Sequence, residues 1–147
     1  MEVYARPANS FVARFVGSPA MTLVPCTILA GDNGFATVDL GNGVAVATRV
    51  PHAGLAMGTT AELGLRPEHV AVTSTGQGDV DAEAILVERL GDRTLVYAQL
   101  PDGIEITAQD TGNSAVRSGD AIGLRINGRA AHLFGPDGVG HHAEVSL

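Results

Sequence analysis

Short apolar runs separated by tight turns follow one another from residue 22 to residue 134. Within one run, Ile104, Ile106 and Ala108 are separated by Glu105 and Thr107. A period of two puts the apolar side chains on one face of a strand and leaves the other face to water. The turn residues, which supply positive φ angles at low cost, are Asp32-Asn33-Gly34, Gly41-Asn42-Gly43, Pro101-Asp102-Gly103 and Asn127-Gly128. This pattern predicts a mainly β, antiparallel protein whose strands form the walls of a small barrel.

The runs divide into two groups at residues 74–79, a polar stretch rich in glycine that has little to bury. We therefore expect a first β lobe over residues 22–73, a second β lobe over residues 80–134, and a tail over residues 135–147. The expected strands cover residues 23–29, 35–40, 44–48, 61–65, 70–73, 82–90, 94–100, 104–108, 121–126 and 130–134.

The first residues follow a different pattern. One stripe of a short helix would contain Ala8, Phe11, Val12, Phe15 and Val16. Asn9 or Pro7 would lie near the start of this helix, and Gly17 and Pro19 would end it. Because so short a helix is marginal alone, its apolar stripe must pack on something, and one candidate is the end of this chain's own barrel.

The charged residues restrict the partners of the chain. The formal net charge is −7, and all nine basic residues are arginine. A P-loop needs a lysine beside its glycines to hold phosphates, so this chain has no Walker-type ATP site of its own. The negative charge and the 4% aromatic content disfavour nucleic acid, which is bound through basic and stacking side chains. No apolar run approaches the ~20 residues that span a bilayer, so we expect no direct membrane insertion.

The sequence offers no convincing catalytic, cofactor or metal site. The histidines at 52, 69 and 132 lie on separate elements, and His141 and His142 are neighbours in the tail, without the ligand spacing of a zinc site. The single cysteine, Cys26, lies in an apolar run and is interpreted as a buried structural thiol in a reducing compartment. We therefore expect this chain not to be an enzyme.

Two charged motifs are candidate contacts. In the first, Pro67 holds Arg66 in an extended conformation, so that Arg66 and Glu68 diverge from a rigid corner. The simpler alternative is that Glu68 caps the next turn and Arg66 pairs with a neighbouring carboxylate. In the second motif, Glu88 and Arg89 precede a glycine turn, where they form either a solvated surface or a contact with a partner or a sugar.

Several segments resemble one protein family in the same order. They are Pro7-Ala8-Asn9-Ser10-Phe11-Val12-Ala13-Arg14-Phe15, Gly64-Leu65-Arg66-Pro67-Glu68, Val87-Glu88-Arg89-Leu90-Gly91 and His132-Leu133-Phe134. The family is that of the ATP-binding subunits of bacterial sugar and glycerol-phosphate ABC importers, of the maltose-importer type. The resemblance covers residues 2 to about 138, and it implies that the chain is the C-terminal regulatory domain, an OB-like (TOBE/MOP-like) barrel in two lobes preceded by one short helix.

The resemblance also implies what surrounds the chain. Residues 1–21 would be the end of an ATPase domain and a linker helix, whose usual packing partner is that domain. ATP and Mg²⁺ would bind in the absent ATPase domain. The expected partners are an identical subunit, in a homodimer, and ABC permease subunits reached through the ATPase domain. The complex would be cytoplasmic and peripheral at the inner face of the cell membrane, and the candidate dimer or regulatory contacts are Arg66, Glu68, Glu88 and Arg89.

A second hypothesis stays open. Related barrels in other importers bind oxyanions, so the chain could instead be a small-ligand module of the OB/MOP type for an oxyanion or a sugar. Backbone amides and hydroxyl groups in the segments 74–76 and 111–114 would supply the ligands.

Overall fold

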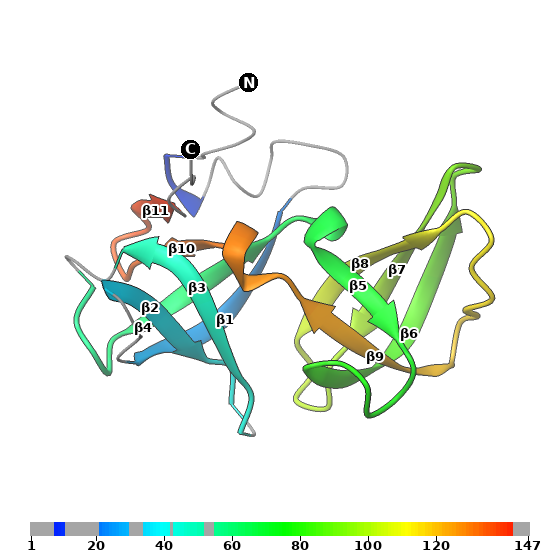
Figure 1. Ribbon diagram of the computed structural model, residues 1–147, viewed down its shortest axis with the longest axis horizontal. Coiled ribbons are helices and arrows are strands. Elements are labelled where there is room, and N and C mark those ends of the chain that lie inside the picture. Colours follow the sequence, from blue (N-terminus) through cyan, green and yellow to red (C-terminus); the bar gives the residue numbers. More distant parts are fainter. Residues whose placement is uncertain (1–7, 11–20, 30–33, 42, 52–54, 143–147) are drawn as a thin grey trace. The chain divides into compact units, whose positions relative to one another are not determined.

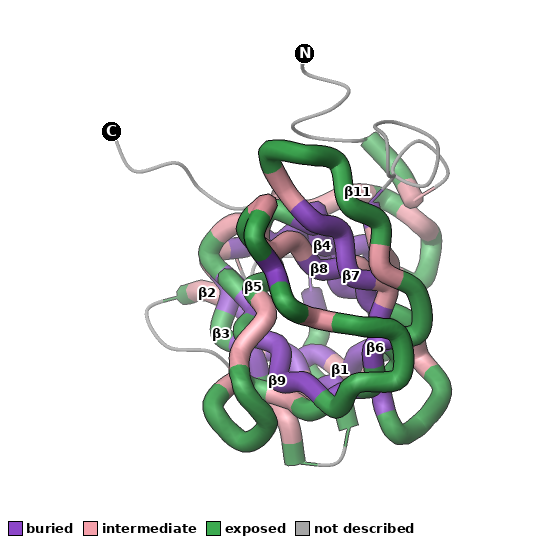
Figure 2. Tube along the Cα trace, turned by 90° about the vertical axis from the view of Figure 1, so that its right-hand side faces the viewer, coloured by how far each residue is buried: buried purple, intermediate pink, exposed green. Residues whose placement is uncertain are grey.

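The computed structural model (Figure 1) describes residues 8–10, 21–29, 34–41, 43–51 and 55–142. Its strands divide between two compact units, one formed by the described residues up to 65 and from 128 onward, the other by residues 66–127. We call these the first unit and the second unit. In both, buried residues are concentrated on the strands and exposed residues in the connecting turns (Figure 2).

The first unit is a six-stranded antiparallel sheet in the order β11-β10-β4-β1-β2-β3. Its strands are β1 (Thr22–Leu29), β2 (Phe35–Asp39), β3 (Ala45–Pro51), β4 (Thr60–Leu65), β10 (His132–Phe134) and β11 (Gly140–His142), and the 3-10 turn η3 (Gly128–Ala130) precedes β10. The sheet curls so that β11 also contacts β3. It is therefore a half-barrel whose two edge strands approach each other.

The core of the first unit requires a glycine on β4. A Cβ atom built at Gly64 would lie 2.5 Å from the Met21 sulfur and 2.9 Å from a ring carbon of Phe134. Phe134 is fully buried and pairs through β10 with β4. A side chain at position 64 would collide with both, so glycine leaves the space that the Phe134 ring and the Met21 side chain occupy.

The second unit is a closed barrel of five strands in the order β5-β8-β7-β6-β9. The strands are β5 (Val70–Thr73), β6 (Val80–Arg89), β7 (Arg93–Gln99), β8 (Glu105–Thr111) and β9 (Ala121–Ile126), and the 3-10 turn η2 (Pro67–His69) precedes them. The strand β5 closes the barrel by pairing with β9 on one side and β8 on the other. Small side chains let this narrow barrel close, because its fully buried residues include Ala84, Ala98 and Ala108 beside Ile106 and Leu124.

The structure confirms the mainly β fold, and each expected strand is present; β5 and β9 have the expected bounds, and the other expected strands are shifted at one or both ends. Among the described strands, one pairing departs from the antiparallel pattern, because β5 and β8 are parallel through Ala71 and Gln109. The expected tail also contributes the short strand β11. Within the described residues, no helix is long and apolar enough to cross a bilayer.

The helix expected over residues 8–16 is not supported. Residues 11–20 lie outside the described part of the chain. Asn9, which was expected near the helix start, forms an antiparallel bridge with Val139. The amide of Ser10 donates to the Gly138 carbonyl at 3.0 Å. The described residues of this segment are thus tied to the C-terminal part of the first unit.

The strand pairing divides the chain differently from the expected boundary at residues 74–79. The strand β5, before this stretch, pairs with β9, and β10, after it, pairs with β4. Residues 74–79 form the turn from β5 to β6 within one barrel, in which the Gln77 amide donates to the Ser74 carbonyl at 3.1 Å. A polar, glycine-rich stretch marks a turn but does not reveal which strands pair across the chain.

Candidate functional site

The Arg66-Pro67-Glu68 corner forms the start of η2. Arg66 has the extended backbone that Pro67 imposes, with φ −83° and ψ 148°, and its carbonyl accepts a hydrogen bond from the His69 amide at 2.9 Å. The Arg66 residue is only 3% exposed, whereas Glu68 is exposed. Of the two charged side chains, Glu68 is therefore the one that a partner can reach.

The second candidate pair lies at the end of β6, where each side chain bonds within the unit. The Glu88 carboxylate accepts a hydrogen bond from the Tyr97 hydroxyl at 3.2 Å. The Arg89 guanidinium donates to the carbonyls of Ser114 at 2.6 Å and Val116 at 2.8 Å. Burial, followed by the nearby Glu88 charge, raises the pKa of Tyr97. Arg89 thus fastens the loop between β8 and β9 to β6, a role that local sequence did not indicate.

A β-bulge lies in the middle of β6. Ala84 pairs with Ala98 and Leu86 pairs with Tyr97, so Ile85 has no partner position on β7. Ala84 is buried, but Ile85 is 43% exposed and Leu86 is 58% exposed. A bulge re-aims side chains in this way, and here it turns two successive apolar residues toward solvent.

Sequence reasoning missed this surface. The sequence feature that could have indicated it is the run Ala84-Ile85-Leu86-Val87, in which four successive apolar residues interrupt the alternation of the strand. Such a run is also compatible with a strand buried on both faces, so exposure could not be deduced from it.

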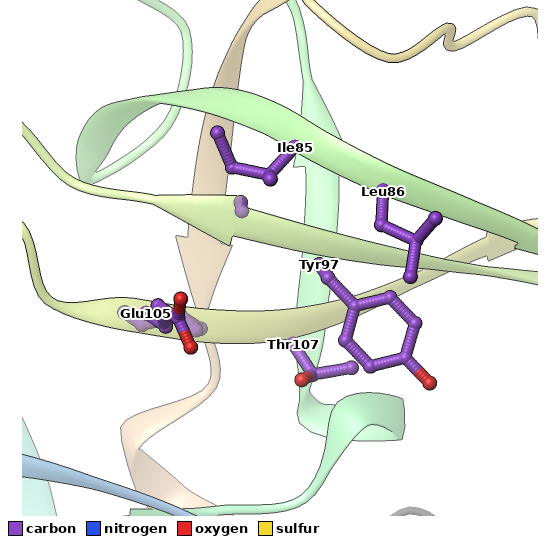
Figure 3. A pocket seen from close by; sticks show the side chains of 7 residues that line it. Ile85, Leu86, Tyr97, Glu105 and Thr107 are labelled. Atoms are coloured by element: carbon purple, nitrogen blue, oxygen red, sulfur yellow. The ribbon is translucent and has the colours of Figure 1, made fainter.

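A shallow pocket with a volume of about 250 Å³ adjoins the bulge. Figure 3 shows Ile85 and Leu86 on β6, with Leu86 near the Tyr97 ring, and Glu105 and Thr107 on β8, the strand next to that of Tyr97. The pocket therefore combines apolar walls with one carboxylate and two hydroxyl groups. A second hollow, of about 340 Å³, is lined by the carboxylates of Asp81 and Glu83 together with Gln99 and Pro101.

The two segments expected to bind an oxyanion use some of their polar groups internally. The Gly76 amide donates to the Asp81 carboxylate at 2.8 Å, and the Ser114 amide donates to the Thr111 carbonyl at 3.1 Å. The Ser114 hydroxyl accepts a hydrogen bond from the Val116 amide at 3.2 Å. These contacts, and the carboxylates in the hollows, disfavour an anionic ligand.

The first unit contains the thiol of Cys26 and a pair of facing histidines. Burial, with a smaller effect of the Glu62 charge, raises the pKa of Cys26 to about 12. His132 and His142 oppose each other on β10 and β11, with their Nδ1 atoms 2.8 Å apart. Across the part of the chain that the structure describes, no group of three or more histidine, cysteine or acidic side chains is arranged to hold a metal ion.

Comparison with protein families agrees with this architecture. A family model described as the MalK OB fold domain matches residues 17–70, and one described as the TOBE domain matches residues 63–134. Residues 17–70 belong to the MalK OB fold domain family and residues 63–134 to the TOBE domain family. The TOBE match contains the whole closed barrel of the second unit, and the MalK OB fold match contains β1 to β4.

Curated relatives with these domains are ATP-binding proteins of importers. The chain is 38% identical over 144 residues to the alpha-glucoside transport ATP-binding protein AglK of Rhizobium meliloti, covering 97% of this chain and 40% of the relative. It is 41% identical over 144 residues to the sn-glycerol-3-phosphate import ATP-binding protein UgpC of Chromohalobacter salexigens, covering 95% and 36%. It is 34% identical over 139 residues to the maltose/maltodextrin import ATP-binding protein MalK of Vibrio vulnificus, covering 94% and 38%.

The chain thus spans about 40% or less of the length of these relatives. Among solved structures, the chain resembles the cytoplasmic molybdate-binding protein ModG, with a TM-score of 0.67 and 18% identity. That match covers 78% of this chain and 95% of the ModG chain. At this identity the likeness shows the shared fold alone.

Proposed function

We propose that this chain is the regulatory and dimerisation domain of the ATP-binding subunit of an ABC importer for sugars or related solutes. The observation that carries the proposal is that the two domain families together match residues 17–134 and that the curated relatives are importer ATP-binding proteins. The absence of lysine from the sequence is consistent with a chain that performs no ATP hydrolysis itself. ATP and Mg²⁺ would then be bound by an ATPase domain outside this chain.

The domain would work mechanically. Two copies of this domain associate and keep two ATPase domains near each other while these open and close on ATP. Each renewed contact between the ATPase domains is then effectively intramolecular. Permease subunits are reached through the ATPase domains, and the assembly lies in the cytoplasm at the inner face of the membrane. The small-ligand alternative has less support, because the loops that would supply its amides bond internally.

Among the four candidate contact residues, Glu68 is best placed for dimerisation. Arg66 is buried, and Glu88 and Arg89 bond to Tyr97 and to the β8–β9 loop. We expect Glu68→Arg to weaken dimers at least about tenfold, because a reversed charge at a complementary contact turns attraction into repulsion. Sedimentation velocity over a concentration series measures the change.

The matched control is Asp92→Arg, which reverses another exposed carboxylate, at the β6–β7 turn. Unchanged sedimentation of the Glu68 variant would reject its contact role, and a wild-type chain that stays monomeric throughout would reject dimerisation by this chain. The coding frame upstream of Met1 tests the wider proposal, since it should continue into a Walker motif.

A further inference from the structure

We propose that the outer face of β6, β7 and β8 in the second unit is a docking surface for an amphipathic helix of a partner protein, with one apolar stripe flanked by lysine or arginine. This inference goes beyond the proposed tether and does not depend on it. We call this face the β6 patch; it consists of Ile85, Leu86, Tyr97 and Thr107 with the carboxylates of Glu83, Glu88 and Glu105.

Hydrogen bonds hold the backbone of the strand segment that carries the apolar part of the β6 patch. The bulge turns Ile85 and Leu86 outward, and the loop between β8 and β9 bonds to the backbone behind them. The Ser118 hydroxyl donates to the Ile85 carbonyl at 2.5 Å, and the Gly119 amide donates to the Ala84 carbonyl at 2.6 Å. Exposing two branched apolar side chains is unfavourable in water, and a surface that is already ordered loses little entropy when a partner covers it.

The strand register surrounds the apolar residues with negative charge. Three rows run across β6, β7 and β8: Glu83-Gln99-Glu105, Leu86-Tyr97-Thr107 and Glu88-Leu95-Gln109. The middle row carries the exposed Leu86 and the Tyr97 ring, while Glu83 and Glu105 lie on one side and Glu88 on the other. The second unit as a whole has ten acidic residues and five arginines. The rim of the β6 patch therefore favours a basic partner.

The dimensions of the rows fit a helix. Adjacent rows are about 7 Å apart along a strand, and the middle row extends about 10 Å across three strands. A helix with its side chains is roughly 10–12 Å wide, so its apolar stripe can cover the middle row while flanking basic side chains reach Glu83 and Glu105 on one side and Glu88 on the other. The pocket beside Leu86 and Tyr97 can receive one apolar side chain of the stripe.

A second copy of this chain is a poorer occupant. A symmetric dimer contact places the same patch on both partners, so the acidic rim that Glu83, Glu88 and Glu105 form on one copy would lie against an equally acidic rim on the other. Like charges held opposite each other oppose association. A basic helix meets the same surface with opposite charges.

The test titrates the isotope-labelled 147-residue chain with a synthetic 14-residue peptide, in which leucines at helical spacing form one stripe and lysines flank it. NMR shift changes should concentrate on β6, β7 and β8, and binding should weaken as salt increases. Leu86→Ser should lower the affinity at least tenfold. The double variant Glu88→Gln, Glu105→Gln keeps the side-chain shapes and should lower the affinity several-fold while flattening the salt dependence.

Two controls decide between this proposal and nonspecific binding. Met57→Ser removes an apolar side chain that is 63% exposed in the first unit, and it should leave the affinity unchanged. A peptide with glutamate in place of each lysine should not bind. The proposal is overturned if shifts are absent or lie elsewhere, if the acidic peptide binds equally, or if Leu86→Ser abolishes self-association while the basic peptide does not bind.

Discussion

At the scale of single residues, Cys26 shows how burial removes chemistry from a reactive group. Burial and the Glu62 charge raise the pKa of its thiol to about 12, so the thiolate, which is the nucleophile, is scarce in the folded protein. We expect iodoacetamide at pH 8.5 to modify native Cys26 at least about tenfold more slowly than the chain unfolded in guanidinium. Equal rates, followed by mass spectrometry, would contradict the buried thiol.

The sign of the effect on stability follows from the same shift. The folded state holds the thiol proton more tightly than the unfolded chain does. The contribution of the protonated thiol to the free energy of unfolding is therefore complete below about pH 9 and declines as pH rises toward 12. We expect the free energy of unfolding of Cys26→Ala to fall less between pH 9 and pH 11 than that of the wild-type chain. Burial raises the pKa of Tyr97 as well, so a smaller decline should persist in the variant.

At the scale of elements, the β8–β9 loop depends on β6. Arg89 donates two hydrogen bonds to loop carbonyls, and we expect Arg89→Ala to destabilise the second unit by about 1 kcal/mol and to speed amide exchange in residues 112–120. Arg125→Ala is the matched control, because Arg125 donates to the Gln77 carbonyl, outside that loop. Equal exchange in the two variants would show that Arg89 does not fasten the loop.

The elements also show how far sequence can predict this protein. Alternation and turn residues predicted the strands, since both are local; β5 and β9 were predicted with their observed bounds. The pairing of β10 with β4 joins segments far apart in the chain, and no local pattern encodes such a pairing. The bulge at Ile85 was missed for a related reason, because it is defined by the register between two strands. The Arg66-Pro67-Glu68 corner was recognised, but the burial of Arg66 depends on its surroundings.

At the scale of the whole molecule, the two units differ in how the chain builds them. The second unit is one continuous segment, residues 66–127, and its barrel closes with its own five strands. The first unit is discontinuous, because β10 and β11 return from the far end of the chain to pair with β4 and with each other. A fragment that ends at residue 65 therefore leaves one edge of β4 unpaired, with Leu63 and Gly64 deprived of their neighbours.

This difference predicts which part of the protein folds alone. We expect residues 66–127 to form the closed barrel in isolation, although so small a domain is marginal, and residues 1–65 to remain unfolded. Amide NMR spectra of each fragment, overlaid on that of the full chain, measure this directly. The spectrum of residues 66–127 should superimpose on that of the full chain except near the ends of the fragment. Poor signal dispersion for that fragment, or good dispersion for residues 1–65, would show that barrel closure is not what makes the second unit independent.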